Sequence, residues 1–167
     1  NMKMLIHDLP KEESETIFTA DRENLIICGD DGTLHQCIGC FSCWINTPGV
    51  CPMQDSFAKI YEMMSSSNEI ILVSRCVFGG LSPFVKNAVD RAMPYLAPEL
   101  EIRNNETCYH PRNQCQDALT IHFYGPVNDD NKKTAVSYAN NLAREWNVIK
   151  LSVLFHETYQ ELGGVAI

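Results

Sequence analysis

The residues with the clearest chemical potential are four cysteines that lie close together near residue 40. They are Cys37, Cys40, Cys43 and Cys51, in a C-x2-C-x2-C-x7-C spacing. Three cysteines at such intervals in a turning loop can converge on one centre, and a fourth that a Pro-Gly turn brings back can complete a tetrahedral thiolate set. A set of this kind can ligate an iron–sulfur cluster. Two alternatives stay open, namely buried apolar thiols in a tight connection and a redox-active dithiol.

A second group of possible metal ligands lies further along the chain, in residues 97–116. Cys108, His110 and Cys115 could be three ligands of a zinc ion. No fourth ligand is evident in the same segment, so an ordinary surface loop is the alternative. We expect residues 97–116 to form a long loop, and a loop of this length in a compact domain is often functional or part of an interface.

Length and composition limit the class of protein to which these residues can belong. The 167 residues suffice for one domain with a core, spanning 1–167, and 45% hydrophobic with 20% charged residues is typical of a soluble globular protein. A net charge of −8 without a basic stripe argues against nucleic acid and anionic membranes as partners. Residues 1–6 lead directly into a predicted strand and are too few for the apolar region of a signal peptide, so we expect none. Eight cysteines in so regular a chain favour a reducing, cytoplasmic location.

Alternating strand and helix patterns predict the fold class. The predicted strands are residues 2–8, 24–29, 69–74, 118–124 and 148–155, and the stronger helices begin near Asp55, Ser82 and Asp130. Five such strands joined by crossovers predict an α/β, flavodoxin-like three-layer domain with a parallel sheet in the order 2-1-3-4-5. Ligands of such sheets bind beyond the carboxyl ends of the strands. The cysteines follow the second strand, so we expect them on that side.

The first and last helices of this fold are weakly encoded. Residues 9–24 and the segment after Phe155 lack a clear helical stripe, although both should cover the same face of the sheet. Polar residues alternate with apolar ones in the last two strands, whereas strands covered on both faces are continuously apolar. We therefore expect a thinly covered, partly polar second face that a second copy of the chain shields in a homodimer.

Several motifs together resemble a known protein family. They are Cys37-x-Gly39-Cys40-Phe41-x-Cys43-Trp44, Pro48-Gly49-x-Cys51 with Asp55, residues 70–74, residues 78–82 and residues 85–91. These motifs resemble the NAD(P)H-dependent FMN reductase and iron–sulfur flavoprotein group of the flavodoxin-like superfamily, closely over residues 25–97 and loosely over 117–155. The resemblance implies FMN as cofactor and NAD(P)H as electron donor. Only the iron–sulfur flavoproteins of this group use such cysteines for a 4Fe-4S cluster.

The resemblance also implies a set of cofactor-binding residues. In the group, the loop after the third strand cradles the flavin ring, mostly through backbone groups. That loop, here called the ring loop (residues 74–80), consists of Ser74, Arg75, Cys76, Val77, Phe78, Gly79 and Gly80. Arg75 could reach a phosphate or a flavin carbonyl, or it could pair with a surface carboxylate.

The chain departs from the family pattern in the loop after the first strand, which holds the FMN phosphate in other members. Residues 7–16 contain no glycine, and four carboxylates (Asp8, Glu12, Glu13 and Glu15) face only one Lys11. A carboxylate about 4 Å from a phosphate charge costs on the order of 4 kcal/mol at an effective dielectric constant of 20, or roughly a thousandfold in affinity. We therefore expect FMN to be weakly bound or absent.

Three functions are compatible with these observations. The first is an FMN-dependent NAD(P)H oxidoreductase, in which the flavin carries the hydride chemistry. The second is a flavodoxin-like domain that has lost its flavin and acts as a binding or assembly module. The third is an electron carrier with a 4Fe-4S cluster on the cysteines. The acidic residues 7–16 separate the first function from the second.

Overall fold

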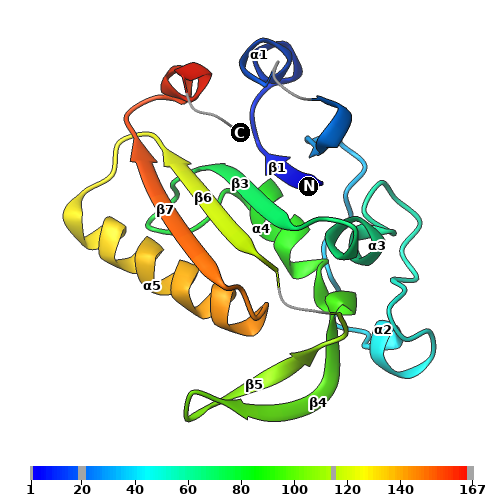
Figure 1. The fold of residues 1–167 in the computed structure, drawn as a ribbon. Coiled ribbons are helices and arrows are strands. Elements are labelled where there is room, and N and C mark those ends of the chain that lie inside the picture. Colours follow the sequence, from blue (N-terminus) through cyan, green and yellow to red (C-terminus); the bar gives the residue numbers. More distant parts are fainter. Residues whose placement is uncertain (1, 19–21, 114–115, 165–167) are drawn as a thin grey trace.

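A parallel sheet forms the centre of the computed structural model, which describes residues 2–18, 22–113 and 116–164 (Figure 1). Its strands are β1 (Lys3–His7), β2 (Leu25–Cys28), β3 (Glu69–Arg75), β6 (Ala118–Tyr124) and β7 (Lys150–His156). Their order is β2-β1-β3-β6-β7, with every pair parallel. This confirms the predicted flavodoxin-like order 2-1-3-4-5. Strand β3 is central and buried on both faces, as its apolar run predicts.

The larger core lies between the sheet and helices α3 (Ile60–Ser65), α4 (Pro83–Asp90) and α5 (Asp129–Glu145). Helix α4 has Pro83 in its first turn, where proline is favoured. Helix α5 is capped by the Asn128 side chain, which accepts a hydrogen bond from the Asn131 amide at 2.8 Å. Within the described residues, none of the helices is long and apolar enough to cross a bilayer.

The helix expected from Asp55 begins later, at Ile60. Asp55 is instead one half of a buried ion pair with Arg91, at 2.5 and 2.9 Å, and both side chains are at most 1% exposed. The Asp55 carboxylate also accepts the amides of His35 and Phe57. Since these partners hold the carboxylate in a turn, it does not cap a helix. The pair ties the end of α4 to the long connection between β2 and α3.

Residues 97–116 were expected to form a long loop, and this expectation was wrong. Strands β4 (Leu96–Arg103) and β5 (Glu106–Pro111) form an antiparallel hairpin outside the main sheet. Asn104 and Asn105 turn the chain with φ of 52° and 64°, and a two-residue hairpin turn of this kind suits asparagine. The Asn-Asn pair was the signal in the sequence. The helix predicted from Ser82 accordingly ends before Leu96.

Of the candidate zinc ligands Cys108, His110 and Cys115, the two that the structure describes have different surroundings. Cys108 is buried, whereas His110 is exposed and bonds the Glu101 carboxylate at 2.7 Å. Cys115 lies outside the described residues. Among the described residues, no three His, Cys, Asp or Glu side chains are arranged to hold a metal ion.

The second face of the sheet is thinly covered, as predicted. Among the residues that the structure describes, only α1 (Lys11–Ile17) and the 3-10 helix η3 (Tyr159–Gly164) lie over it, near the carboxyl ends of the strands (Figure 1). Elsewhere this face is polar, with Lys3 and Glu69 paired at 3.4 Å. Ile27 and Leu154 both remain 39% exposed. Large apolar side chains on an uncovered sheet face favour a partner surface.

We expect replacement of Asp55 by Asn to lower the free energy of unfolding by about 3–5 kcal/mol, because it leaves the Arg91 charge buried without its partner. Burial raises the pKa of Asp55, but hydrogen bonds from Arg91, His35 and Phe57 outweigh this and lower it. The contribution is therefore present at neutral pH and is lost as the pH falls through the acidic range. Urea unfolding at pH 7 and at acidic pH measures both effects.

The matched control is Asp90→Asn. The Lys86–Asp90 pair has the same 2.5 Å separation as the Asp55–Arg91 pair, but both of its side chains are 44% exposed. An exposed pair contributes no more than about 1 kcal/mol. Equal losses in the two variants would contradict the role assigned to the buried pair.

We also expect the chain to be a homodimer that buries the second face. Leu154→Lys should shift it to a monomer, because a charge would then replace an apolar contact. Val136→Lys is the control, since Val136 is 40% exposed on α5, beyond the other face. Light scattering measures the mass. A monomeric unmodified chain, or equal effects of the two substitutions, would refute this arrangement.

Candidate functional site

The carboxyl edge of the sheet, where we expected the flavin, carries a carboxylate of the protein itself, that of Asp8. Asp8 follows β1 directly and accepts two hydrogen bonds, from the Arg75 amide at 2.8 Å and from the Tyr124 hydroxyl at 2.9 Å. These donors belong to the ends of β3 and β6. Burial and the Asp8 charge raise the pKa of Tyr124, which keeps its hydroxyl a donor. The Asp8 carboxylate thus occupies two hydrogen-bond donors at the edge where a ligand anion would bind.

Other donors of the β1 loop are also engaged. The Leu9 amide donates to His7 Nδ1 at 3.2 Å, and the Asp8 amide donates to the Val73 carbonyl at 3.3 Å. The Ser14 and Thr16 hydroxyls donate to carbonyls of their own helix. Helix α1 has seven residues and two glutamates in its first turn. Residues 7–16 therefore do not fit the phosphate of FMN.

The ring loop is held firmly against its surroundings. Ser74 is buried, and its hydroxyl accepts the Ser82 amide at 2.8 Å and donates to the Arg75 carbonyl. Val77 and Gly80 exchange two backbone hydrogen bonds around a tight turn. A side chain at Gly79 would meet the Asn131 carbonyl of α5 at 2.8 Å, at a φ of +82° that already favours glycine.

Other members of the ring loop point outward. Phe78, at the tip of the turn, is 89% exposed with a φ of 50°, and Arg75 is also exposed. Cys76 is half-buried. The loop therefore presents a fixed backbone and an exposed aromatic ring at the carboxyl edge. Its binding of a flavin ring remains a prediction.

The cysteine loop (residues 37–51) lies away from the carboxyl edge, contrary to expectation. It leaves the carboxyl end of β2 but reaches the end of α4, where its short helix α2 (Ser42–Ile45) packs against the 3-10 helix η2 (Met93–Tyr95) (Figure 1). Trp44 anchors it there by donating to the Met93 carbonyl at 3.1 Å and packing on Tyr109 of the hairpin, with ring centroids 5.1 Å apart. Because α4 runs antiparallel to the strands, its end lies at their amino edge.

The four thiols of this loop are free and differ in burial. Cys37 and Cys40 are exposed, Cys51 is half-buried and Cys43 is buried. Burial raises the pKa of Cys43, and the other three thiols raise it further, so the four are neighbours. They nevertheless belong to the described residues in which no metal-holding group is found. The loop collects four thiols at one place without arranging them as a ligand set.

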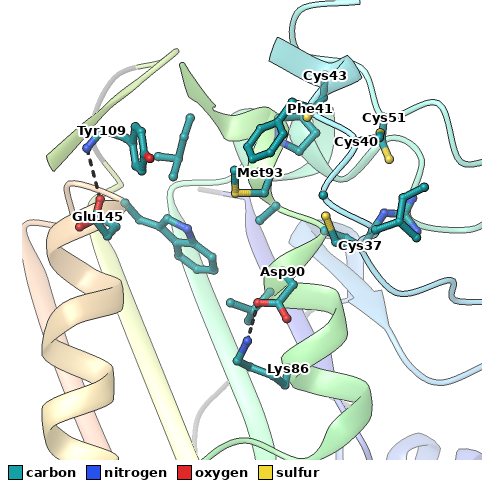
Figure 2. Close-up of a pocket in the computed structure, with 18 of the residues that line it drawn as sticks. Cys37, Cys40, Phe41, Cys43, Cys51, Lys86, Asp90, Met93, Tyr109 and Glu145 are labelled. Atoms are coloured by element: carbon teal, nitrogen blue, oxygen red, sulfur yellow. Dashed lines mark hydrogen bonds and ion pairs between the residues drawn. The ribbon is translucent and has the colours of Figure 1, made fainter. Parts of the chain in front are cut away.

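A cavity of about 550 Å³ opens beside the cysteine loop (Figure 2). The cysteines form one side, Tyr109 and Glu145 the opposite side, and the end of α4 the floor. The lining is mostly apolar or aromatic. It includes all four cysteines of the loop, Ile38, Phe41, Met53, Val89, Ala92, Met93, Leu96, Tyr109, Tyr138, Leu142 and Trp146. A volume in this range and such a lining are typical of sites for small organic molecules.

Each charged group that lines the cavity has a polar partner in the chain. Lys86 bonds Asp90 at 2.5 Å, and Glu145 accepts the Tyr109 amide at 3.3 Å (Figure 2). Arg91 is held by Asp55. Sequence reasoning found the cysteines but missed the helical and hairpin residues of this cavity, because the hairpin was expected to be a loop.

Comparison with known sequences gives a partial match. No protein-family model matches the chain. Over 92 residues it is 36% identical to an iron–sulfur flavoprotein from Methanocaldococcus jannaschii, and over 91 residues 28% identical to one from Archaeoglobus fulgidus. These alignments span 55% and 54% of this chain but only 41% and 44% of the relatives. The chain thus matches less than half the length of these curated relatives.

Solved structures match nearly the whole fold. An azoreductase gives a TM-score of 0.60 at 9% identity, over 96% of this chain and 89% of that one. An azoreductase from Bacillus anthracis gives 0.58 at 10% identity (98% and 93%), and an NADPH-quinone reductase from P. pentosaceus gives 0.56 at 10% (94% and 86%). At such identities the likeness concerns the fold alone. Over about half its length the chain is thus similar in sequence to iron–sulfur flavoproteins, and its fold is flavodoxin-like, which agrees with the resemblance of its motifs to the NAD(P)H-dependent FMN reductase and iron–sulfur flavoprotein group.

Proposed function

We propose that the chain is an NAD(P)H-dependent oxidoreductase that uses FMN and holds it loosely. The observation that carries this proposal is the 36% identity over 92 residues to a protein named an iron–sulfur flavoprotein, on a flavodoxin-like sheet. The electron donor is NAD(P)H, since structural neighbours include an NADPH-quinone reductase. Flavin supplies the hydride chemistry in such enzymes, and the protein positions it.

The ring loop is the part of the chain that would position the flavin. Its backbone is fixed by the Ser74 hydroxyl, by the turn between Val77 and Gly80 and by the close contact of Gly79 with α5. A fixed backbone can present amide and carbonyl groups to a flat ring at little entropic cost. Phe78 is exposed beside these groups and could cover the ring.

The affinity for FMN is limited by Asp8. Its carboxylate already occupies the Arg75 amide and the Tyr124 hydroxyl and would repel a phosphate. This observation favours a second candidate function, a flavodoxin-like domain that has lost its flavin and serves as a binding module. The two candidates differ in one measurable property, the affinity for FMN.

We expect Asp8→Asn to raise the affinity for FMN, by up to about a thousandfold if the phosphate lies near 4 Å from residue 8, because the amide removes the repulsion and keeps an acceptor for Arg75 or Tyr124. Titration of the purified protein with FMN, followed by flavin fluorescence, measures the dissociation constant. NADPH oxidation in the presence of FMN should rise in parallel.

The control for this substitution is Glu12→Gln, which removes an equal charge from an exposed position in the first turn of α1. We expect a much smaller gain, because an exposed charge is screened by solvent. Tight, stoichiometric FMN in the unmodified chain would refute our interpretation of Asp8. Failure of both the chain and Asp8→Asn to bind FMN would refute the oxidoreductase and favour the binding module.

The thiols allow a separate test of the electron-carrier alternative. Protein purified without oxygen should be colourless and lack stoichiometric iron, because the burial of the four cysteines differs and they form no ligand set. Iron and zinc assays with an absorption spectrum measure this. Brown protein that contains iron, loses it in Cys40→Ser and keeps it in Cys76→Ser would instead establish a cluster on the cysteine loop.

A further inference from the structure

We propose that the cavity at the amino edge of the sheet is a second binding site, for a small, neutral, flat aromatic molecule. It lies where the cysteine loop, the end of α4, the end of α5 and the β4–β5 hairpin meet (Figure 2). The proposal does not depend on flavin binding, which belongs to the opposite edge of the sheet.

Two segments outside the main sheet form much of the cavity wall. The connection between β2 and α3 and the β4–β5 hairpin are the two long segments that add no strand to the main sheet. They are separate in sequence, yet Trp44 of one packs on Tyr109 of the other. Both segments place residues on the larger core, and that packing leaves the hollow between them unfilled.

The backbone is strained at Phe41, a residue of the cavity wall. Phe41 has a φ of 53°, in the left-handed region, and leaves its ring 47% exposed beside the cavity. A bulky side chain is rarely found at positive φ, and such strain persists where the surrounding structure enforces it, often at binding sites. Here Trp44 enforces it through its ring contact with Phe41, at 5.3 Å, and its bond to Met93.

The side chains that line the cavity indicate the class of ligand. Rings of Phe41 from the cysteine loop, Tyr109 from the hairpin, and Tyr138 and Trp146 from α5 and its end line the cavity, which favours a flat aromatic molecule. The charged groups that line the cavity already have partners in the chain, which favours a neutral ligand over an ion. Tyr138 can donate its hydroxyl to a ligand carbonyl or amine, because burial and the nearby Asp90 raise its pKa and keep it protonated.

The test uses the neutral dye N-phenyl-1-naphthylamine, whose emission rises in an apolar site. Trp146 lines the cavity, and Trp44 packs on two of its rings, so tryptophan excitation should transfer to the bound dye. We expect saturable binding of one dye per chain. Ile38→Asp should weaken it about tenfold or more, because it places a charge in the apolar wall.

The matched control is Ile45→Asp. Ile38 and Ile45 belong to the same loop and are 67% and 75% exposed, so neither change should unfold the protein, but only Ile38 lines the cavity. Circular dichroism confirms the fold of both variants. An equal effect of the two substitutions, or the absence of saturable binding, would overturn the proposal.

Thiol modification locates the dye independently. Cys37 and Cys40 are exposed and line the cavity, whereas Cys76 lies in the ring loop. Bound dye should slow the alkylation of Cys37 and Cys40 and leave Cys76 unchanged, as mass spectrometry can measure. FMN should not displace the dye. Displacement by FMN, or protection of Cys76, would place the dye at the flavin edge and refute a second site.

Discussion

The buried ion pair between Asp55 and Arg91 is the interaction on which the position of the cysteine loop depends. Arg91 ends α4, and Asp55 lies in the connection between β2 and α3. Through this pair and the His35 carbonyl, which accepts from Arg91 at 2.8 Å, the connection is fixed at both sides of the cysteine loop. A buried pair is costly to break, since a single charge would remain without water. The cysteine loop is thus a fixed wall.

The carboxyl and amino edges of the sheet differ from the arrangement that is usual in such α/β folds. The carboxyl edge, where ligands of such sheets commonly bind, carries its own anion in Asp8 and a ring loop fixed by backbone contacts. The amino edge contains the apolar cavity. The Asp8 carboxylate occupies donors that a phosphate would need, so this edge is poorly suited to an anionic group. The cavity, by contrast, exposes aromatic rings that only a ligand or a partner would cover.

These features explain how a chain can keep a family resemblance and still differ in its chemistry. Backbone geometry at the ring loop rests on Gly79 and Ser74, whereas phosphate binding rests on charge. A few side chains therefore suffice to weaken cofactor binding without disturbing the fold. Function in such folds is decided by individual sites, and fold-level likeness to reductases leaves those sites open.

The sequence by itself determined the sheet. Apolar runs and their spacing predicted five strands, their order and the weakness of the first and last helices, because burial and strand crossovers depend on local pattern. It also pointed to the four carboxylates of residues 7–16, of which the structure shows that Asp8 bonds the ends of two neighbouring strands. Only the tertiary structure decided where the cysteines lie and that Asp55 pairs with Arg91, because both depend on contacts between segments far apart in the chain. The hairpin and its cavity likewise required tertiary structure, since Tyr109, Trp44 and Trp146 share no local pattern and meet only when α5, the hairpin and the cysteine loop pack together.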